Sequence, residues 1–409
     1  MLKSVTLLGS SSGRNAGDAA LMSGIMDPVD EACGERLLYE IPTINKAFVS
    51  RTYRNRTRPV GMMPWNLSVK MLGLPTYQSI LRTDYTLIFD AILFDRSLYN
   101  PLFNFLSTLA VLLPRARRKG KRMACFNVGA GPVDTEAGRR MLREVAELMD
   151  FITVRDEESI SIFRDVGVRN PNIVLAADAA VNVQPVESNR ALEIIKMSGL
   201  DPARPILAVN VNRYLDTWAR PRREPIGKEQ FLDTFSKSLN FVAGETGAQV
   251  LLVATQHHDV SITRELLGCL DSSVAGAWIG NIDYNHYELK GVMGACSLLF
   301  AMRLHASILG ASAGTPVLGL AYQPKVEFFY NSLGLRDQCI GFDRFTPDDL
   351  SRHLLAGWRD REQIREVLRS RIPELQSDAR IAADVLAAVH RGEPIGSVLG
   401  NTSSKAEPS

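Results

Sequence analysis

The amino-acid sequence predicts an α/β protein built from two Rossmann-like domains, in which helices flank parallel sheets. Short apolar segments rich in β-forming residues alternate with helical segments from residue 5 onward, and this alternation is typical of parallel βαβ units. The alternation starts again at Pro205, after a polar stretch over 185–204 that has the composition of a domain boundary. A chain of 409 residues is long enough to form two hydrophobic cores.

The domain limits follow from the point at which the alternation restarts. We expect an N-terminal Rossmann-like domain over 1–190 and a C-terminal one over 200–358, joined by a hinge within 185–204. Amphipathic helices over 359–392 are expected to pack back across the hinge. The polar segment 393–409 is expected to be a disordered tail.

In the N-terminal domain, each predicted strand is an apolar run that ends in a polar or glycine-rich turn. The first strand, 5–10, runs into a loop of small residues, and a helix is expected from Ala19 with Asp18 as its N-cap. The apolar run 102–114 is shorter than the roughly 20 residues that span a bilayer, so it is predicted to be a buried helix. Further strands are predicted within 85–95, 122–132, 151–168 and 172–181.

In the C-terminal domain, the segment 297–325 is the most informative part of the chain. Its sequence, SLLFAMRLHASILGASAGTPVLGLAYQPK, predicts a strand, a helix and a second strand. Arg303 and His305 lie where the first strand gives way to the helix. Ligands of open α/β sheets bind at the carboxyl ends of strands, and helix N-termini favour anions. The two side chains therefore predict a phosphate or carboxylate site, although each also has a structural interpretation, as an ion-pair arginine and a core histidine.

Other strand ends carry polar residues that are candidates for the same cleft. Arg155 follows one strand of the first domain, where it is a candidate substrate contact but is more readily explained as a structural residue. Asp18, in the first loop, is a candidate general base with a competing role as helix cap. The candidates in the second domain follow three of its strands: Asn212 and Arg213, Gln256 and His258, and Tyr322 and Lys325.

Composition and charge exclude several classes of protein. The formal net charge is +2, so there is no global signal for binding nucleic acid. The five cysteines are scattered and odd in number, and no pair of them has metal-ligand spacing. This pattern indicates a reduced, cytoplasmic protein. The N-terminal segment reads as a first strand, not as a signal peptide. No cofactor is predicted, because the first glycine loop lacks the spacing of dinucleotide and triphosphate motifs.

One segment of the first domain, 44–66, departs from the regular alternation. It carries Arg51, Arg54, Arg56 and Arg58, with Tyr53 and Trp65 nearby. Its pattern is too irregular to predict a helix, so we expect a mobile surface loop, or a lid over an anionic or sugar ligand. The four arginines are also candidates for peripheral contact with an anionic membrane surface, which would place the protein at the inner face of the membrane.

Six segments of the chain resemble the polysaccharide pyruvyl transferase family. The first three are NAGDAAL near the N-terminus, GAGP at 129–132 and TVRDEES at 153–159. They are followed by VNVNR at 209–213, QHHD at 256–259 and MRLHASILGASAGTPVLGLAYQPKV at 302–326, of which the last is the most specific. The resemblance covers about residues 5 to 335.

The resemblance implies a fold and an activity. Members of the family have two Rossmann-like domains in the GT-B arrangement, with the acceptor on the N-terminal side and the donor on the C-terminal side. They transfer a pyruvyl group from phosphoenolpyruvate to a sugar hydroxyl of a cell-surface polysaccharide or its lipid-linked precursor, forming a pyruvate ketal. By this resemblance, Arg303 and His305 are the donor-phosphate and catalytic residues, and Arg213 is a second anion contact. No metal is required, since protein cations can stabilise the developing charge.

The segment 87–95 departs from the family pattern. Members often have a Gly-Gly turn after the third strand of the first domain, where this chain reads LIFDAILFD. The acceptor is therefore the least constrained part of the prediction. Two alternatives stay open: a GT-B-type glycosyltransferase that uses a nucleotide-sugar donor, and a protein of the same fold that binds sugars or anions without turnover.

Overall fold

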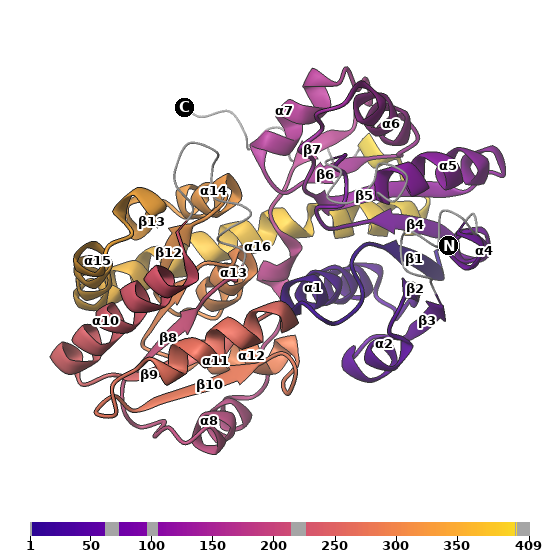
Figure 1. Cartoon of the computed structure of the whole chain (residues 1–409). Coiled ribbons are helices and arrows are strands. Elements are labelled where there is room, and N and C mark those ends of the chain that lie inside the picture. Colours follow the sequence, from indigo (N-terminus) through magenta and orange to yellow (C-terminus); the bar gives the residue numbers. More distant parts are fainter. Residues whose placement is uncertain (1, 62–72, 96–104, 214–225, 397, 399–409) are drawn as a thin grey trace. The chain divides into compact units, whose positions relative to one another are not determined.

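The computed structural model describes residues 2–61, 73–95, 105–213, 226–396 and 398, and these residues form two compact units (Figure 1). Unit 1 comprises Met1–Gly13, Asp18–Asn182 and Leu375–Ser409, and unit 2 comprises Arg14–Gly17 and Val183–Glu374. The chain thus passes from the first unit to the second at 182/183, just before the predicted hinge region of 185–204, and returns at Leu375. The predicted tail, 393–409, lies mostly outside the described residues.

The described part of unit 1 contains a seven-stranded sheet in the order β3-β2-β1-β4-β5-β6-β7, and every neighbouring pair is parallel. This order places a topological switch point between β1 and β4. The strands are β1 (Ser4–Leu8), β2 (Leu38–Thr43), β3 (Thr57–Gly61), β4 (Tyr85–Ile88), β5 (Arg122–Val128), β6 (Ile152–Val154) and β7 (Ile173–Leu175).

Apolar helix faces cover the first sheet. One buried cluster joins the apolar residues of β4, β5 and β6 to α4, α5, α6 and α7, including Ile80, Leu109, Leu142 and Phe163. The helices of this unit are α1 (Ala16–Cys33, which begins in unit 2), α2 (Lys46–Thr52), α4 (Leu74–Arg82), α5 (Phe105–Arg118), α6 (Glu136–Glu147) and α7 (Glu157–Asp165). Helix α5 confirms the buried helix that the apolar run before Pro114 predicts.

The prediction that the arginine-rich segment forms no packed element is wrong. Residues 46–52 form α2, and residues 57–61 form β3, the edge strand. Arg58 and Arg82 both form ion pairs with Glu40 of β2, whose side chain is fully buried. The strand pattern of β2 is hidden by a buried glutamate, Glu40, which two arginines stabilise. The pattern of β3 is hidden by Pro59, which a strand at the edge of a sheet tolerates. Arg51, Arg54 and Arg56 are exposed, so membrane contact stays a prediction, and Trp65 lies outside the described residues.

The described part of unit 2 contains a six-stranded sheet in the order β10-β9-β8-β11-β12-β13, again with every neighbouring pair parallel. Its switch point lies between β8 and β11. The strands are β8 (Ile206–Asn210), β9 (Gln249–Ala254), β10 (Gly276–Gly280), β11 (Leu298–Ala301), β12 (Val317–Ala321) and β13 (Cys339–Gly341).

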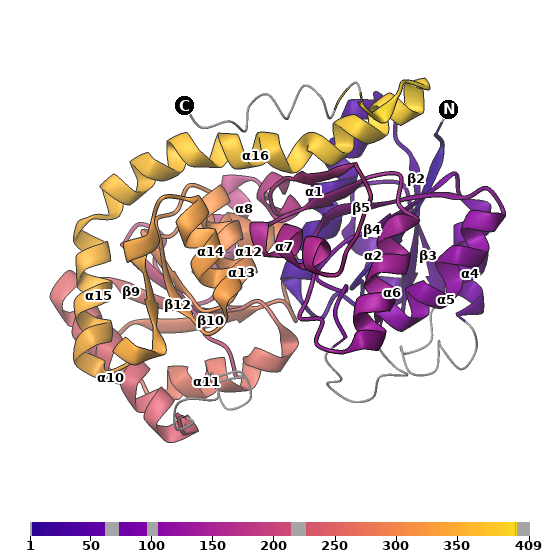
Figure 2. The ribbon, with the colours of Figure 1, turned by 90° about the horizontal axis from the view of Figure 1, so that it is seen from above.

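Aromatic and aliphatic side chains fill the core of unit 2. Phe231 and Phe235 of α10 pack against each other and against Phe345, and Phe235 also packs against Phe300 of β11, at centroid distances between 4.7 and 5.9 Å. The helices are α8 (Ser188–Met197), α10 (Lys228–Thr246), α11 (Val260–Gly268), α12 (His286–Gly294), α13 (Leu304–Ser312), α14 (Pro324–Ser332) and α15 (Pro347–Arg359). The last helix, α16 (Arg361–Arg391), begins in unit 2 and ends in unit 1 as one continuous helix (Figure 2).

The predicted fold class is confirmed: two parallel sheets, each flanked by helices, in a GT-B-like fold. One local prediction is wrong. Helix α1 begins at Ala16 and not near Ala19, and the side chain of Asn15 accepts a hydrogen bond from the Gly17 amide at 2.9 Å. Asp18 therefore lies inside the first turn and is not the N-cap.

Candidate active site

The switch point of the second sheet is the place where the polar candidates come together. Asn210 ends β8, and it accepts two hydrogen bonds from the residues that follow β11. The Met302 amide donates to its carbonyl and the Arg303 amide to its Oδ1, both at 3.0 Å. Asn212 and Arg213 follow β8, so they and Arg303 flank the crevice where open α/β sheets bind ligands.

Arg303 is held by a carboxylate that follows β9. Its Nε donates to Asp259 Oδ2 at 2.6 Å and its Nη2 to Asp259 Oδ1 at 2.8 Å, which makes a bidentate pair. Nη2 also donates to Asn212 Oδ1 at 3.2 Å. The Asp259 side chain is fully buried and that of Arg303 is 14% exposed. Arg303 thus pairs with a carboxylate, as its structural interpretation requires. It also lies at the crevice, as a ligand contact requires.

Tyr322 joins the same group from the end of β12. Burial raises the pKa of its hydroxyl above the ordinary value, and the nearby Arg303 and Asn212 oppose this shift. Lys325 lies in the first turn of α14, two residues after the strand-end loop, and is half-buried. The structure therefore brings Tyr322 beside Arg303, which hydrogen-bonds with Asn212.

His305 lies where two helices begin. It is the second residue of α13, for which Arg303 is the N-cap, and its ring packs against Gly17 in the first turn of α1. A Cβ atom placed on Gly17 would lie 2.2 Å from His305 Nδ1. Helix N-termini carry partial positive charge and amide donors, so two of them beside one imidazole favour a bound anion.

Residues 14–17 belong to the same site although they come from the first loop of the chain. Asn15 and Gln256 form an antiparallel β-bridge. The Ala16 amide donates to the Thr255 carbonyl at 2.8 Å, and the His257 amide donates to the Arg14 carbonyl at 2.9 Å. These bonds make the loop part of unit 2 and bring Arg14, which sequence reasoning missed, to the histidines after β9. The only sequence signal was its place in a polar loop that follows the first strand.

The charges around His258 are predominantly positive. Partial burial, followed by the charges of Arg213, Arg14 and Arg303, lowers the pKa of His258, and the carboxylate of Asp259 opposes them. Three guanidinium groups against one carboxylate produce a local excess of positive charge. The Oε1 atom of Gln256 is buried and has no hydrogen-bond partner among the described residues. A small anion fits this positive environment.

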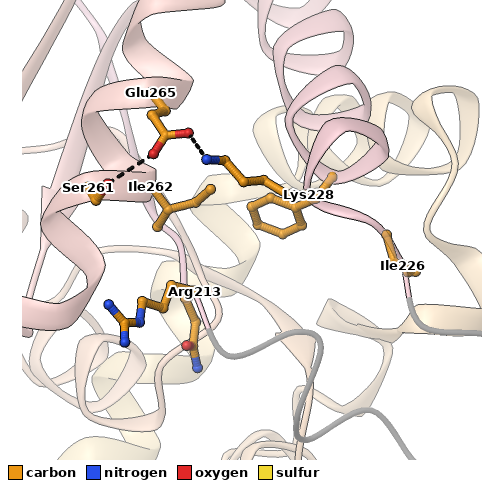
Figure 3. A pocket seen from close by; sticks show the side chains of 8 residues that line it. Arg213, Ile226, Lys228, Ser261, Ile262 and Glu265 are labelled. Atoms are coloured by element: carbon orange, nitrogen blue, oxygen red, sulfur yellow. Dashed lines mark hydrogen bonds and ion pairs between the residues drawn. The ribbon is translucent and has the colours of Figure 1, made fainter.

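A pocket of about 230 Å³ adjoins Arg213 (Figure 3). Arg213 and Asn212 line it on one side, and Lys228 of α10 and Glu265 of α11 form an ion pair on the other. Ser261 donates to Glu265 at 2.9 Å. Phe231 and two isoleucines add an apolar wall. The pocket therefore offers both a cation and an apolar surface beside the anion site.

Arg155 lies in unit 1, where its side chain is 6% exposed and pairs with Asp178 at 3.2 Å and Asp156 at 3.5 Å. These ion pairs agree with its structural interpretation, and its contact with a substrate stays a prediction. Asp90, in the segment 87–95 that lacks the glycine pair, adopts a φ of 71° and so takes the left-handed conformation that glycine favours. The departure in sequence thus leaves a glycine-like backbone at the end of β4.

No group of three or more His, Cys, Asp or Glu side chains is placed to hold a metal ion within the described residues. None of the helices formed by these residues has the length and apolar character needed to span a bilayer.

Comparison with known proteins places this site in a family. The profile of the family described as polysaccharide pyruvyl transferase matches residues 15–324. The chain belongs to the polysaccharide pyruvyl transferase family. The match begins at Asn15 and ends at Pro324, so it includes every residue of the site except Arg14 and Lys325. Membership makes the protein a polysaccharide-modifying transferase.

One curated relative and two solved structures are similar to this chain. The amylovoran biosynthesis protein AmsJ of Erwinia amylovora is 22% identical over 430 residues. The alignment covers 94% of this chain and 99% of that protein. HepE of Anabaena, solved with UDP-glucose, has a TM-score of 0.59 at 12% identity and covers 96% of this chain and 100% of its own. UDP-GlcNAc 2-epimerase of Neisseria meningitidis, solved with UDP-GlcNAc, has a TM-score of 0.62 at 11% identity, with coverage of 94% and 99%. At these identities the two structures show the shared fold.

Proposed function

We propose that this pyruvyl transferase family member moves a pyruvyl group from phosphoenolpyruvate to a sugar hydroxyl of an exopolysaccharide or its lipid-linked precursor, forming a pyruvate ketal. The observation that carries the proposal is the cationic site of unit 2, where the charges of Arg14, Arg213 and Arg303 act on His258. Phosphoenolpyruvate presents a phosphate and a carboxylate, and guanidinium groups match both. The similarity to an amylovoran biosynthesis protein supports a polysaccharide acceptor.

The proposed chemistry assigns a proton to each step. His305 donates a proton to the methylene carbon of the donor, and the acceptor hydroxyl oxygen bonds to the adjacent carbon while a base takes the hydroxyl proton. Asp18, which follows Gly17 in the first turn of α1, is proposed as that base. The bond to the phosphate oxygen then breaks, and phosphate leaves with the electron pair. A second sugar hydroxyl adds to the same carbon and loses its proton, which closes the ketal.

The site residues divide between donor binding and positioning. Arg213 is proposed to contact the donor, since it is exposed at the end of β8 and lines the pocket of Figure 3. Gln256 and His258 are proposed to add polar contacts, and Lys325 a further cation. Asn212 holds Arg303 through a hydrogen bond, and Tyr322 lies beside it.

Replacing Arg213 with alanine is expected to weaken phosphoenolpyruvate binding by about tenfold or more, because a charge-assisted hydrogen bond contributes roughly 1.5–3 kcal/mol. The side chain is exposed, so the melting temperature should change little. Calorimetric titration and a thermal melt measure the two effects. A variant that binds the donor normally but melts much earlier would show that Arg213 has a structural role.

Donor binding is expected to take up protons, because negative charge beside His258 favours its imidazolium form. The pKa of His258 is lowered in the free protein, which favours the neutral ring, and a bound anion raises the pKa again. Affinity should therefore rise as the pH falls from the pKa of the bound state toward that of the free state. Calorimetry in buffers of different ionisation enthalpy measures the uptake. His258→Gln supplies the control, and uptake equal to that of the wild type in this variant would contradict the prediction.

The donor assignment is tested by a panel of ligands. Phosphoenolpyruvate should raise the melting temperature in proportion to the logarithm of its saturation, whereas UDP-glucose and UDP-GlcNAc should leave it unchanged. Stabilisation by a nucleotide-sugar without any by phosphoenolpyruvate would favour a glycosyltransferase.

A further inference from the structure

We infer that Asp259 is a positioning residue that fixes two donor-binding arginines at once; this inference rests on the proposed function of the site. Asp259 holds the guanidinium of Arg303 through its carboxylate. It also accepts a hydrogen bond from the Arg213 backbone amide at 3.2 Å. One carboxylate therefore sets the orientation of Arg303 and the place where the Arg213 side chain begins.

The arrangement joins three strand ends. Arg213 follows β8, Asp259 follows β9, and Arg303 follows β11, which are neighbours in the order β9-β8-β11. Asp259 is itself fixed, because its amide donates to the Gln256 carbonyl at 2.9 Å within the turn that follows β9. These hydrogen bonds between three strand ends hold the crevice residues in place before a ligand binds.

The burial of Asp259 makes its contribution specific. The side chain is fully buried, so it meets the donor only through Arg303 and the Arg213 backbone. A free arginine side chain samples many rotamers, and a bidentate carboxylate restricts it to one. A site that is ordered before binding loses less entropy when the donor arrives. Asp259 therefore strengthens donor binding although its charge is the same sign as that of the donor.

This last point separates positioning from charge. Asp259→Asn removes one negative charge from the site while keeping the size of the side chain. If charge alone mattered, the variant would bind an anionic donor more tightly than the wild type. If Asp259 positions the arginines, the variant will bind the donor more weakly, because the amide cannot accept both guanidinium bonds.

The experiment compares Asp259→Asn with Glu40→Gln in the full chain. Glu40 is a matched control, since it is also a fully buried carboxylate that holds arginines, but in unit 1. Calorimetry should show phosphoenolpyruvate binding weakened about tenfold or more in Asp259→Asn and unchanged in Glu40→Gln, while both variants lose melting temperature. Asp259→Asn that binds the donor as tightly as the wild type, or more tightly, overturns the inference.

A double-mutant cycle tests the route of the effect. In an Arg303→Ala background, Asp259→Asn should weaken binding by much less than it does in the wild type, and fully additive effects would overturn the inference. Arg303→Lys serves if Asp259→Asn fails to fold, because it keeps the charge but loses the two-bond pair, and it should weaken donor binding to a similar degree. If the Arg303→Lys variant binds the donor as tightly as the wild type does, the inference is also overturned.

The outcome remains separable from the proposed function. Wild-type protein that does not bind phosphoenolpyruvate contradicts the donor assignment, and inorganic phosphate then replaces it as the probe in the same comparison. Failure of the wild type to bind either anion contradicts both proposals.

Discussion

Replacing His305 with asparagine is expected to remove turnover while phosphoenolpyruvate still binds. Asparagine is polar and of similar size, but it cannot deliver a proton at neutral pH. General acid catalysis contributes roughly 10²–10⁴-fold to a rate, so phosphate release should fall by about that factor. The arginines whose charges act on His258 remain in place, so the donor affinity should change far less than the rate.

The control for this variant is His257→Asn. The His257 side chain is exposed, and the contact of this residue with Arg14 is made by its backbone amide, which the substitution keeps. This variant should release phosphate at the rate of the wild type. Full activity in His305→Asn would exclude His305 as the proton donor, and equal losses in both variants would indicate a general disturbance of the site.

Replacing Gly17 with alanine is expected to be nearly as damaging, through packing. The added Cβ would lie 2.2 Å from Nδ1, 2.4 Å from Cγ and 2.6 Å from Cβ of His305. The short distance to the His305 Cβ means that a rotation of the ring alone cannot relieve the overlap. The starts of α1 and α13 must therefore separate, at a cost of about 1–3 kcal/mol. Because a shift of about 1 Å can cost a hundredfold in rate, activity should fall by roughly that factor.

Gly244→Ala is the matched control for Gly17→Ala. Gly244 lies on the exposed side of α10, and nothing lies within 4 Å of its added Cβ. Alanine is a better helix former than glycine, so this variant should keep its activity and melt at the same temperature or slightly higher. Initial rates and thermal melts of the two variants decide the matter. Unchanged activity in Gly17→Ala would mean that the packing of His305 on α1 has no part in turnover.

The parts of the fold that the sequence predicts well are those in which apolar runs alternate with helices. The segment 297–325 is the clearest example, since its strand, helix and strand match β11, α13 and β12. Strands β2 and β3 escaped prediction because Glu40 and Pro59 interrupt their patterns. Only the contacts of the folded chain, two arginines on Glu40 and an edge position for Pro59, explain why strands form there.

The candidate site was predictable to a similar degree. Arg303 and His305 could be placed at a strand end from local pattern alone, and Asn212 and Tyr322 contact Arg303 as convergence at one crevice requires. Asp259 and Arg14 could not be assigned. The role of Asp259 depends on a pair 44 residues apart in sequence, and that of Arg14 on a bridge between Asn15 and Gln256. Neither partner leaves a periodic signal that a single sequence can show.

The most direct measurement is product analysis with labelled donor. The full-length protein is incubated with phosphoenolpyruvate that carries carbon-14 in its pyruvyl group and with a panel of nitrophenyl galactosides, glucosides and mannosides. At least one saccharide should gain the mass of pyruvate less one water, with one phosphate released for each label transferred and with no transfer by His305→Asn. In a parallel incubation, UDP-glucose replaces phosphoenolpyruvate. Release of nucleoside diphosphate with transfer of glucose there, and no transfer of the pyruvyl label in the first incubation, would contradict the assignment.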